Sequence, residues 1–318
     1  MSERVPLILD VDTGIDDALA LAYALRAPAA ELVAITTLAG NVGVERTTAN
    51  TLSVLDWLGA PEVPVHRGAS RPLVRVHRDA AYFHDSDGLG GAGLPLSKRV
   101  LGADRGPAAV VRLANARPGE LTLVCLGPLT NLAIALNVEP RLPELLRGVV
   151  VMGGAYGVPG NITPRAEFNV FADPEAAAQV FAAPFPRLTL VGLDVTQQTG
   201  ITRPAWDAIV ADGGGDTATR LLVKVAQRPF EERMVERLHL HDPLAVAVAL
   251  DPSLVETERF AVSVGVDGEE RGMTRVTGPG GAAVARAVAV DAFLDRFSAA
   301  LALPRSAGRL AAGGNRPA

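Results

Sequence analysis

Four aspartates lie close together near the start of the chain, in the segment DVDTGIDD at residues 10–17. An apolar run precedes this segment and an Ala/Leu-rich run follows it. If the first run is a strand, Asp10 and Asp12 point the same way, because side chains alternate between the two faces. Gly14 permits a tight turn, and Asp16 and Asp17 then begin a helix.

Carboxylates this close repel one another unless protons or a cation neutralise them. A hard divalent ion such as Ca²⁺ prefers oxygen ligands of this kind. A simpler interpretation is that aspartate is a common helix N-cap and favours the positive end of the helix dipole. That accounts for Asp16 or Asp17 alone, but not for four acids together. The segment therefore predicts a metal site.

The composition excludes several functional classes. The chain has 318 residues, of which 48% are hydrophobic and 20% are charged, enough for a large core in one or two domains. The net charge of −5 gives no electrostatic reason to expect nucleic acid or an anionic membrane as partner. Cys125 is the only cysteine, so no disulfide or thiolate zinc site is expected, and its apolar surroundings predict a core residue. We expect no signal peptide or membrane span, and hence a cytoplasmic protein.

Apolar runs alternate with helical patterns through most of the chain. The patterns predict strands from Leu7 and at residues 32–37, 63–65, 121–126, 148–152 and 188–193, and helices at 16–26, 44–58, 107–116, 129–137 and 174–182. This rhythm indicates an α/β fold with a mostly parallel central sheet flanked by helices, open and Rossmann-like.

The last third of the sequence is less regular. We expect helices at 204–210, 217–227, 242–250 and 292–303, and strands at 260–266 and 282–290. No linker or repeat divides the chain, so residues 1–303 are expected to form one domain, with a frayed tail at 304–318.

Polar residues recur just after the predicted strands, at Asp12, Asn41, residues 161–169 and Asp194. Ligands of open α/β sheets bind at the carboxyl edge of the strands, so these residues are expected to converge. Two irregular stretches, 71–99 and 155–171, are longer than simple connections, and loops of that length are commonly functional.

Two other motifs in the sequence resemble known functional patterns. The glycine-rich segment 88–93 matches G-x-G-x-x-G, but no strand precedes it and no helix follows, which argues against a dinucleotide site. A strand followed by D-x-D-T is also how haloacid-dehalogenase-type phosphatases begin, with Asp10 as the phosphoryl acceptor. Against that, the chain's two lysines, Lys98 and Lys224, follow no strand, and the paired acids at 16–17 are foreign to the pattern.

A set of short segments resembles the inosine–uridine-preferring nucleoside hydrolases, in the order that this family has them. The segments are DVDTGIDDA at 10–18, TTLAGN at 36–41, LGPLTN at 126–131, VMGG at 151–154, GNITPRAEFN at 160–169, DPEA at 173–176 and HDP at 241–243. The resemblance implies a nucleoside hydrolase type of fold, with Ca²⁺ as cofactor and a homodimer or homotetramer as the assembly.

The resemblance also implies roles for individual residues. The calcium ligands would be Asp12, Asp17, the Leu126 carbonyl and Asp242. Asp12 would also take the proton of the attacking water, and His241 would act as the acid for the leaving base. The substrate-binding residues would be Asp16, Asn41, Asn161, Glu167 and Asn169 at the ribose hydroxyls, Met152 in the sugar pocket and His84 in the base pocket.

The expected reaction is calcium-dependent hydrolysis of the N-glycosidic bond of a ribonucleoside, giving ribose and free base. A carboxylate-rich pocket suits it, because cleavage develops positive charge on the sugar. The alternatives are the phosphatase described above and a calcium-dependent ribose- or nucleoside-binding protein without turnover.

The sequence departs from the family at two places. Thr13 stands where many members have proline. Residues 227–239 (QRPFEERMVERLH) replace a region in which relatives often carry aromatic residues against the base, and Phe230 is the only aromatic there. Base preference is therefore left open.

Overall fold

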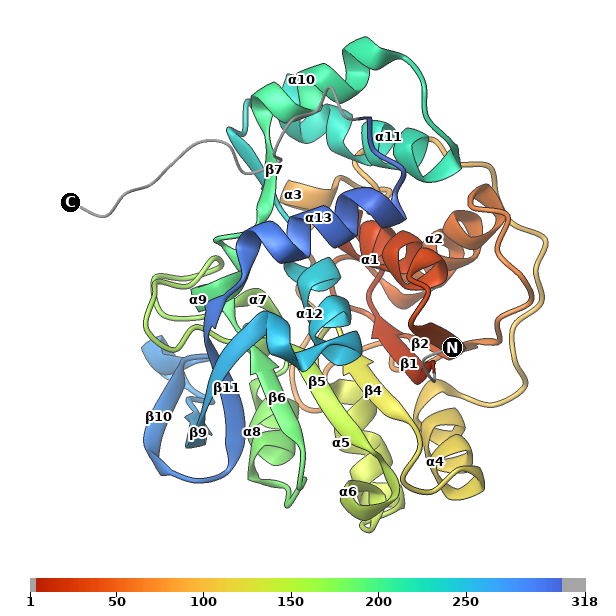
Figure 1. The fold of residues 1–318 in the computed structure, drawn as a ribbon. Helices are drawn as coiled ribbons and strands as arrows, with labels where there is room; N and C mark the ends of the chain where they lie inside the picture. The colour runs from red at the N-terminus through yellow and green to blue at the C-terminus, as the bar shows by residue number, and fades with distance from the viewer. Residues whose placement is uncertain (1–3, 305–318) are drawn as a thin grey trace.

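The computed structural model describes residues 4–304, and a single large sheet forms its centre (Figure 1). Its nine strands lie in the order β10-β9-β11-β6-β5-β4-β1-β2-β3. Neighbouring strands are parallel from β11 to β3, and β9 pairs antiparallel with both β10 and β11. The strands are β1 (Val5–Val11), β2 (Ala30–Thr37), β3 (Val65–Arg67), β4 (Thr122–Cys125), β5 (Gly148–Met152), β6 (Leu188–Val191), β9 (Val255–Val264), β10 (Thr274–Pro279) and β11 (Ala282–Val288). The predicted fold class, mostly parallel α/β, is confirmed.

Helices cover both faces of the sheet, because the central strands are apolar on both sides. In β1, Leu7 and Leu9 pack into one hydrophobic cluster while Ile8 packs into another on the opposite face. The first cluster lies under α1 (Ile15–Arg26), α2 (Val44–Trp57), α12 (His241–Leu250) and α13 (Val290–Ala300). The second lies under α4 (Gly106–Ala116), α5 (Thr130–Val138), α6 (Leu142–Leu145) and α8 (Pro174–Ala182). Cys125 is fully buried in the second cluster, as predicted.

A smaller group of elements lies apart from the large sheet, at the top of Figure 1. It contains α10 (Arg203–Asp212), α11 (Thr217–Glu231) and an antiparallel pair, β7 (Gly200–Thr202) with β8 (Arg237–His239). Three short helices, α3 (Ala81–His84), α7 (Phe168–Ala172) and α9 (Leu193–Thr196), interrupt segments that we expected to be irregular or strand. None of the helices within residues 4–304 is long and apolar enough to cross a membrane.

Most predicted elements occur, with local differences that have physical causes. The strand predicted at 63–65 lies at Val65–Arg67, because Pro64 has no N–H to add to a ladder. The strand predicted at 260–266 is the second half of β9, whose first half is exposed and charged. The helix predicted at 217–227 continues through Pro229 to Glu231. The strands β7, β8 and β10 were not predicted. Residues 305–318 of the expected tail lie outside the described residues.

Candidate active site

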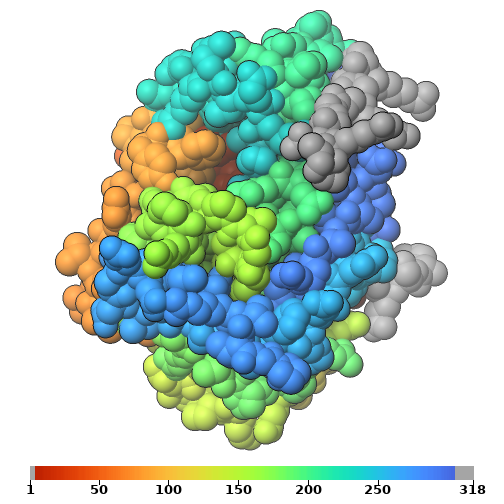
Figure 2. Space-filling model, turned by 90° about the vertical axis from the view of Figure 1, so that its left-hand side faces the viewer, coloured from red at the N-terminus to blue at the C-terminus, as the bar shows by residue number. Residues whose placement is uncertain are grey.

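A cavity of about 400 Å³ opens at the carboxyl edge of the parallel strands. Three segments far apart in the sequence form its walls: residues 80–84, 152–169 and 235–242. Figure 2 shows the hollow between these segments, drawn in orange, yellow-green and cyan, with the red N-terminal segment at its floor. Asn41 and residues of the 161–169 stretch therefore meet at this edge, as the parallel topology predicted. Asp194 was expected there too, but it does not line the cavity and instead accepts the backbone N–H of Tyr156 at 2.8 Å.

The floor of the cavity holds a cluster of acids. One carboxylate oxygen from each of Asp16, Asp17 and Asp242 lies within 4.8 Å of the others. Asp17 sits in the first turn of α1 and accepts the backbone N–H of Gly14 at 2.9 Å and that of Asp12 at 3.2 Å. These bonds fix the turn between β1 and α1, so the local sequence itself positions Asp17. Asp242 arrives from the first turn of α12, more than two hundred residues later.

Asp12 lies beneath this floor and is fully buried. Its Oδ2 accepts the backbone N–H of Asn41 at 2.7 Å, and its Oδ1 has no hydrogen-bond partner among the described residues. Two glycines make room for the carboxylate. A methyl group at Gly127 would lie 2.7 Å from Oδ1, and one at Gly40 would collide with Oδ2. The carboxylate of Asp12, which follows β1, therefore requires glycine at position 40 after β2 and at position 127 after β4.

Burial raises the pKa of every acid in the cluster. The pKa of Asp16 rises to about 7, with the charge of Asp17 as the second cause, and that of Asp17 rises to about 6. Burial first, and neighbouring acids second, raise the pKa values of Asp12 and Asp242 well above their usual range. A divalent cation would remove this cost, since it would attract the charged forms of all four groups.

The donor set fits a hard divalent cation. It consists of oxygens alone, one of which, Asp12 Oδ1, is buried without a partner. The predicted carbonyl ligand, Leu126, lines the cavity and accepts the side-chain N–H of Asn169 at 2.7 Å. The geometric cluster contains Asp16 in place of Asp12, whereas the resemblance assigned Asp12 to the ion and Asp16 to the sugar.

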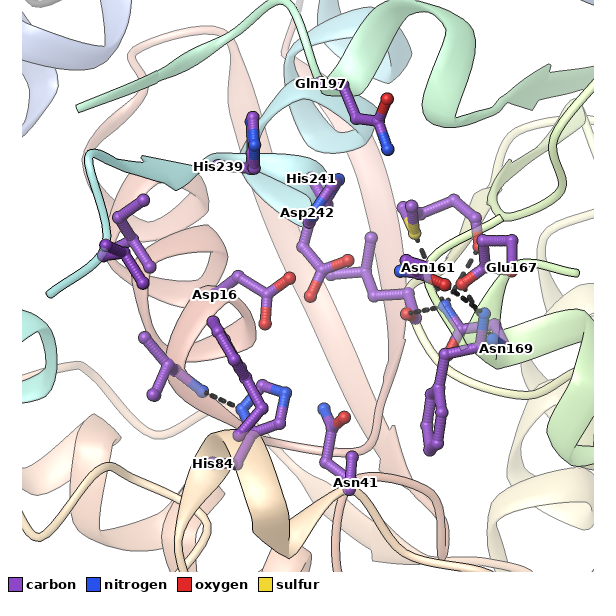
Figure 3. A pocket seen from close by; sticks show the side chains of 18 of the residues that line it. Asp16, Asn41, His84, Asn161, Glu167, Asn169, Gln197, His239, His241 and Asp242 are labelled. Atoms are coloured by element: carbon purple, nitrogen blue, oxygen red, sulfur yellow. Dashed lines mark hydrogen bonds between the residues drawn. The ribbon is translucent and has the colours of Figure 1, made fainter. Parts of the chain in front are cut away.

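The predicted sugar-binding residues form one wall of the cavity (Figure 3). Glu167 caps α7 and accepts the N–H groups of Asn169 at 2.7 Å and Val170 at 3.1 Å. Asn161 Oδ1 accepts the N–H of Phe168 at 2.9 Å, which ties the irregular segment to α7. The residues of this wall that were predicted from sequence are Met152, Asn161, Glu167 and Asn169. Asn41, on the opposite side, also lines the cavity.

Both predicted histidines line the cavity. His84 Nδ1 accepts the backbone N–H of Ile15 at 3.0 Å, and His241 Nδ1 lies 2.7 Å from the Thr196 hydroxyl. Burial lowers the pKa of each ring to about 3, so both are neutral at ordinary pH. His239 also lines the cavity, and its ring centroid is 5.4 Å from that of His241.

Phe230, the one aromatic residue of the segment 227–239, lies outside the cavity wall. Phe230 is fully buried and stacks on Trp206, with ring centroids 5.0 Å apart, so it does not face the cavity. The aromatic side chains that line the cavity come from other segments, and sequence reasoning missed them and two polar lining residues because no local pattern marks them. These lining residues are Tyr82, Phe83, Phe168, Gln197 and Arg237.

Asp10 stays under the pocket and does not line it. It is 1% exposed, and its Oδ1 accepts hydrogen bonds from Thr36 at 2.5 Å and Asn131 at 2.7 Å. Burial raises its pKa to about 6. A phosphoryl acceptor has to reach its substrate, so this placement argues against the phosphatase interpretation.

An acidic, histidine-containing pocket at the carboxyl edge of a mostly parallel sheet defines the protein as an α/β enzyme that acts on a small molecule. The family model described as inosine-uridine preferring nucleoside hydrolase matches residues 7–295. The inosine-uridine preferring nucleoside hydrolase of Leishmania major is 39% identical over 278 residues, which cover 85% of this chain and 87% of that protein. The non-specific ribonucleoside hydrolase RihC of Shigella boydii is 40% identical over 267 residues, which cover 84% of this chain and 86% of that protein.

Solved structures agree with these sequence matches. A plant nucleoside hydrolase, PpNRh1, superposes with a TM-score of 0.88 at 32% identity and covers 94% of this chain and 99% of its own. A purine-preferring ribonucleoside hydrolase from Gardnerella vaginalis superposes with a TM-score of 0.86 at 34% identity, and the match covers 97% of this chain and 100% of that chain. The chain belongs to the inosine-uridine preferring nucleoside hydrolase family, and it is a nucleoside hydrolase by fold, pocket and sequence.

Proposed function

We propose that this enzyme hydrolyses the N-glycosidic bond of ribonucleosides with the help of a bound Ca²⁺ ion, releasing ribose and the free base. The observation that carries the proposal is the convergence of acids, amides and two neutral histidines on one cavity. Figure 3 shows Asp16 and Asp242 between His84 on one side and His239 and His241 on the other, with Asn161, Glu167 and Asn169 on a further side. Acids and amides beside neutral rings suit a molecule with a hydroxyl-rich half and an aromatic half.

Asp12, Asp17, Asp242 and the Leu126 carbonyl would hold the ion. When bound, it would lower the pKa of a water molecule and fix the hydroxyls of the sugar. Asp16 lies within the same group of oxygens and would bind a ribose hydroxyl. Calcium suits an all-oxygen site of this kind, because magnesium is smaller and keeps more of its own water.

Asn41, Asn161, Glu167 and Asn169 would orient the ribose by hydrogen bonds to its hydroxyls, with Met152 against the ring. Asp12 would take a proton from the attacking water. As that oxygen bonds to the sugar carbon, the bond to the base breaks and positive charge develops on the ribose, which the surrounding carboxylates stabilise.

His241 would donate a hydrogen bond or a proton to the departing base, which leaves with the electron pair of the broken bond. His84 would contact the base from the α3 side. Tyr82 and Phe83 would supply an apolar surface for the base. The base preference itself follows from no single residue here.

We further propose that the enzyme is a homodimer or homotetramer, as the resemblance implies, and that it is cytoplasmic, as the sequence suggested. Gel filtration with light scattering would measure the assembly.

The experiment that tests the reaction is a panel of purine and pyrimidine ribonucleosides, with free ribose as the readout. Release of ribose from at least one nucleoside supports the proposal. A nucleoside bound tightly without ribose release would favour the binding-protein alternative. Release of phosphate from a phosphorylated sugar, lost on Asp10→Asn, would favour the phosphatase.

A further inference from the structure

His84 and His241 share a feature: in each ring, Nδ1 is held by a hydrogen bond to a neighbouring residue of the protein. For His84 the partner is the backbone N–H of Ile15, at 3.0 Å. For His241 it is the hydroxyl of Thr196, the last residue of α9, at 2.7 Å. A neutral imidazole carries one proton, and the bond at one nitrogen decides which nitrogen has it.

The His84 tautomer follows directly from its partner. A backbone N–H can only donate, so Nδ1 of His84 must accept and the ring proton must be on Nε2. Figure 3 shows the other ring nitrogen on the side away from this bond, facing the cavity.

The His241 tautomer follows from the burial of Thr196. This residue is fully buried, and within residues 4–304 the His241 ring is the only hydrogen-bond partner of its hydroxyl. A buried O–H group needs an acceptor, so the hydroxyl donates to Nδ1. Because Nδ1 of His241 accepts this bond, it carries no proton, and the ring proton of His241 is also on Nε2.

We propose that Thr196 is a positioning residue that holds His241 in the Nε2–H form, so that His241 and His84 together present two N–H donors to the leaving base. This inference rests on the proposed function and adds to it. As the bond between sugar and base breaks, the electron pair passes to the base, and the two donors stabilise it there. The substrates are then nucleosides whose base has hydrogen-bond acceptors to meet both groups.

The turn that carries Thr196 is well placed for this role. The carbonyl of Thr196 accepts the Thr199 hydroxyl at 3.0 Å, and the carbonyl of Thr199 accepts the N–H of Leu240 at 3.3 Å. The turn is therefore tied to the segment that ends in His241. The Thr199 hydroxyl makes no contact with the histidine, and it offers a matched control at the same turn.

The test uses the full-length protein in calcium-containing buffer, with Thr196→Val, Thr196→Ser and Thr199→Val. We expect Thr196→Val to lower kcat on a natural nucleoside by about 10- to 100-fold, as loss of an orienting partner of a functional histidine does. Turnover of nitrophenyl riboside, whose leaving group needs no such donor, should stay near that of the wild type. Thr196→Ser should keep kcat on the natural nucleoside near that of the wild type. Thr199→Val should leave the ratio of the activities on the two substrates unchanged.

Nitrogen-15 NMR of the histidine rings supplies an independent readout. We expect a protonated Nε2 and a bare Nδ1 at both His84 and His241 in the wild type. A protonated Nδ1 at His241, or equal losses on both substrates in Thr196→Val, would overturn the inference. If the wild type releases no ribose from any nucleoside, the proposed function fails, whatever the tautomers are. If it does release ribose and Thr196→Val is unimpaired, only the present inference fails.

Discussion

Arg228 on α11 forms an ion pair with Asp85, which directly follows α3. A second arginine reinforces the link: Arg233 donates to the backbone carbonyl of Tyr82 and lies over the ring of Phe83, 5.6 Å from its centroid. Charged residues of the segment 227–239, where the sequence departs from the family, thus join α11 and the residues after it to α3 at the edge of the cavity. They hold Tyr82 and Phe83 in place from outside.

We expect Asp85→Asn to raise KM with little change in kcat. Asparagine tolerates the positive φ of 66° at this position, so the change removes charge and little else. A partly exposed ion pair is worth about 0.2–1 kcal/mol, which corresponds to a KM increase of at most about fivefold. Salt should raise the KM of the wild type toward that of the variant, because salt screens the pair. Arg112→Gln, which breaks a remote pair with Asp104, is the control. If the KM of Asp85→Asn equals that of the wild type at low salt, the ion pair between Asp85 and Arg228 does not help to position the cavity wall.

Asp12→Asn should keep the fold and reduce turnover by about 10²- to 10⁴-fold, the usual contribution of a general base. The amide oxygen can still accept the Asn41 N–H, and the walls at Gly40 and Gly127 admit a side chain of the same size. Thermal melting checks the fold, and added Ca²⁺ should not restore the rate. Asp10→Asn is the matched control, because Asp10 is two residues away and does not line the cavity, and this variant should lose far less turnover than Asp12→Asn. Near-normal turnover of Asp12→Asn would remove Asp12 as the base.

His241→Ala should impair natural nucleosides far more than an activated nitrophenyl riboside. The natural base is a poor leaving group and depends on the donor, whereas nitrophenolate departs unaided. The comparison of kcat/KM for the two substrates is the measurement. Equal losses on both would show that the ring only supports the structure.

Chelation should remove one tightly held ion per chain and abolish turnover, which Ca²⁺ should restore. Elemental analysis before and after chelation identifies the ion and its stoichiometry. The Asp242→Asn variant should hold less metal, because Asp242 is the ligand that reaches the cluster from α12. A protein that is fully active and contains no metal would disprove the assignment.

The metal-free protein should lose stability as the pH rises from the ordinary aspartate range to about 7. Burial raises the pKa of Asp10 to about 6, that of Asp16 to about 7 and that of Asp17 to about 6, from 3.8. In that window the folded protein binds more protons than the unfolded chain, so unfolding becomes easier as the pH increases. Metal should reverse the trend, and its effect on Tm should be larger at about pH 8 than at about pH 5. A metal-free Tm that rises across the window would contradict the burial of these acids.

The sequence by itself determined the local parts of this protein. The segment DVDTGIDD gave strand, turn and helix from its own residues, and the hydrogen bonds from Gly14 and Asp12 to Asp17 lie entirely within it. The apolar runs predicted the parallel sheet, and the parallel sheet predicted that residues after separate strands would meet. These inferences work because side-chain periodicity and turn chemistry act over a few residues.

Only the tertiary structure decided the rest. Phe230 is the one aromatic residue of the segment 227–239, and it is buried against Trp206, whereas Tyr82 and Phe83, from a segment of no clear pattern, line the cavity. The bond between Thr196 and His241 joins residues 45 positions apart, and no periodicity marks either end. Contacts of this kind depend on how α9, α11 and α12 pack around the sheet. Packing is set by the whole core and not by any one segment, so it cannot be derived from local pattern.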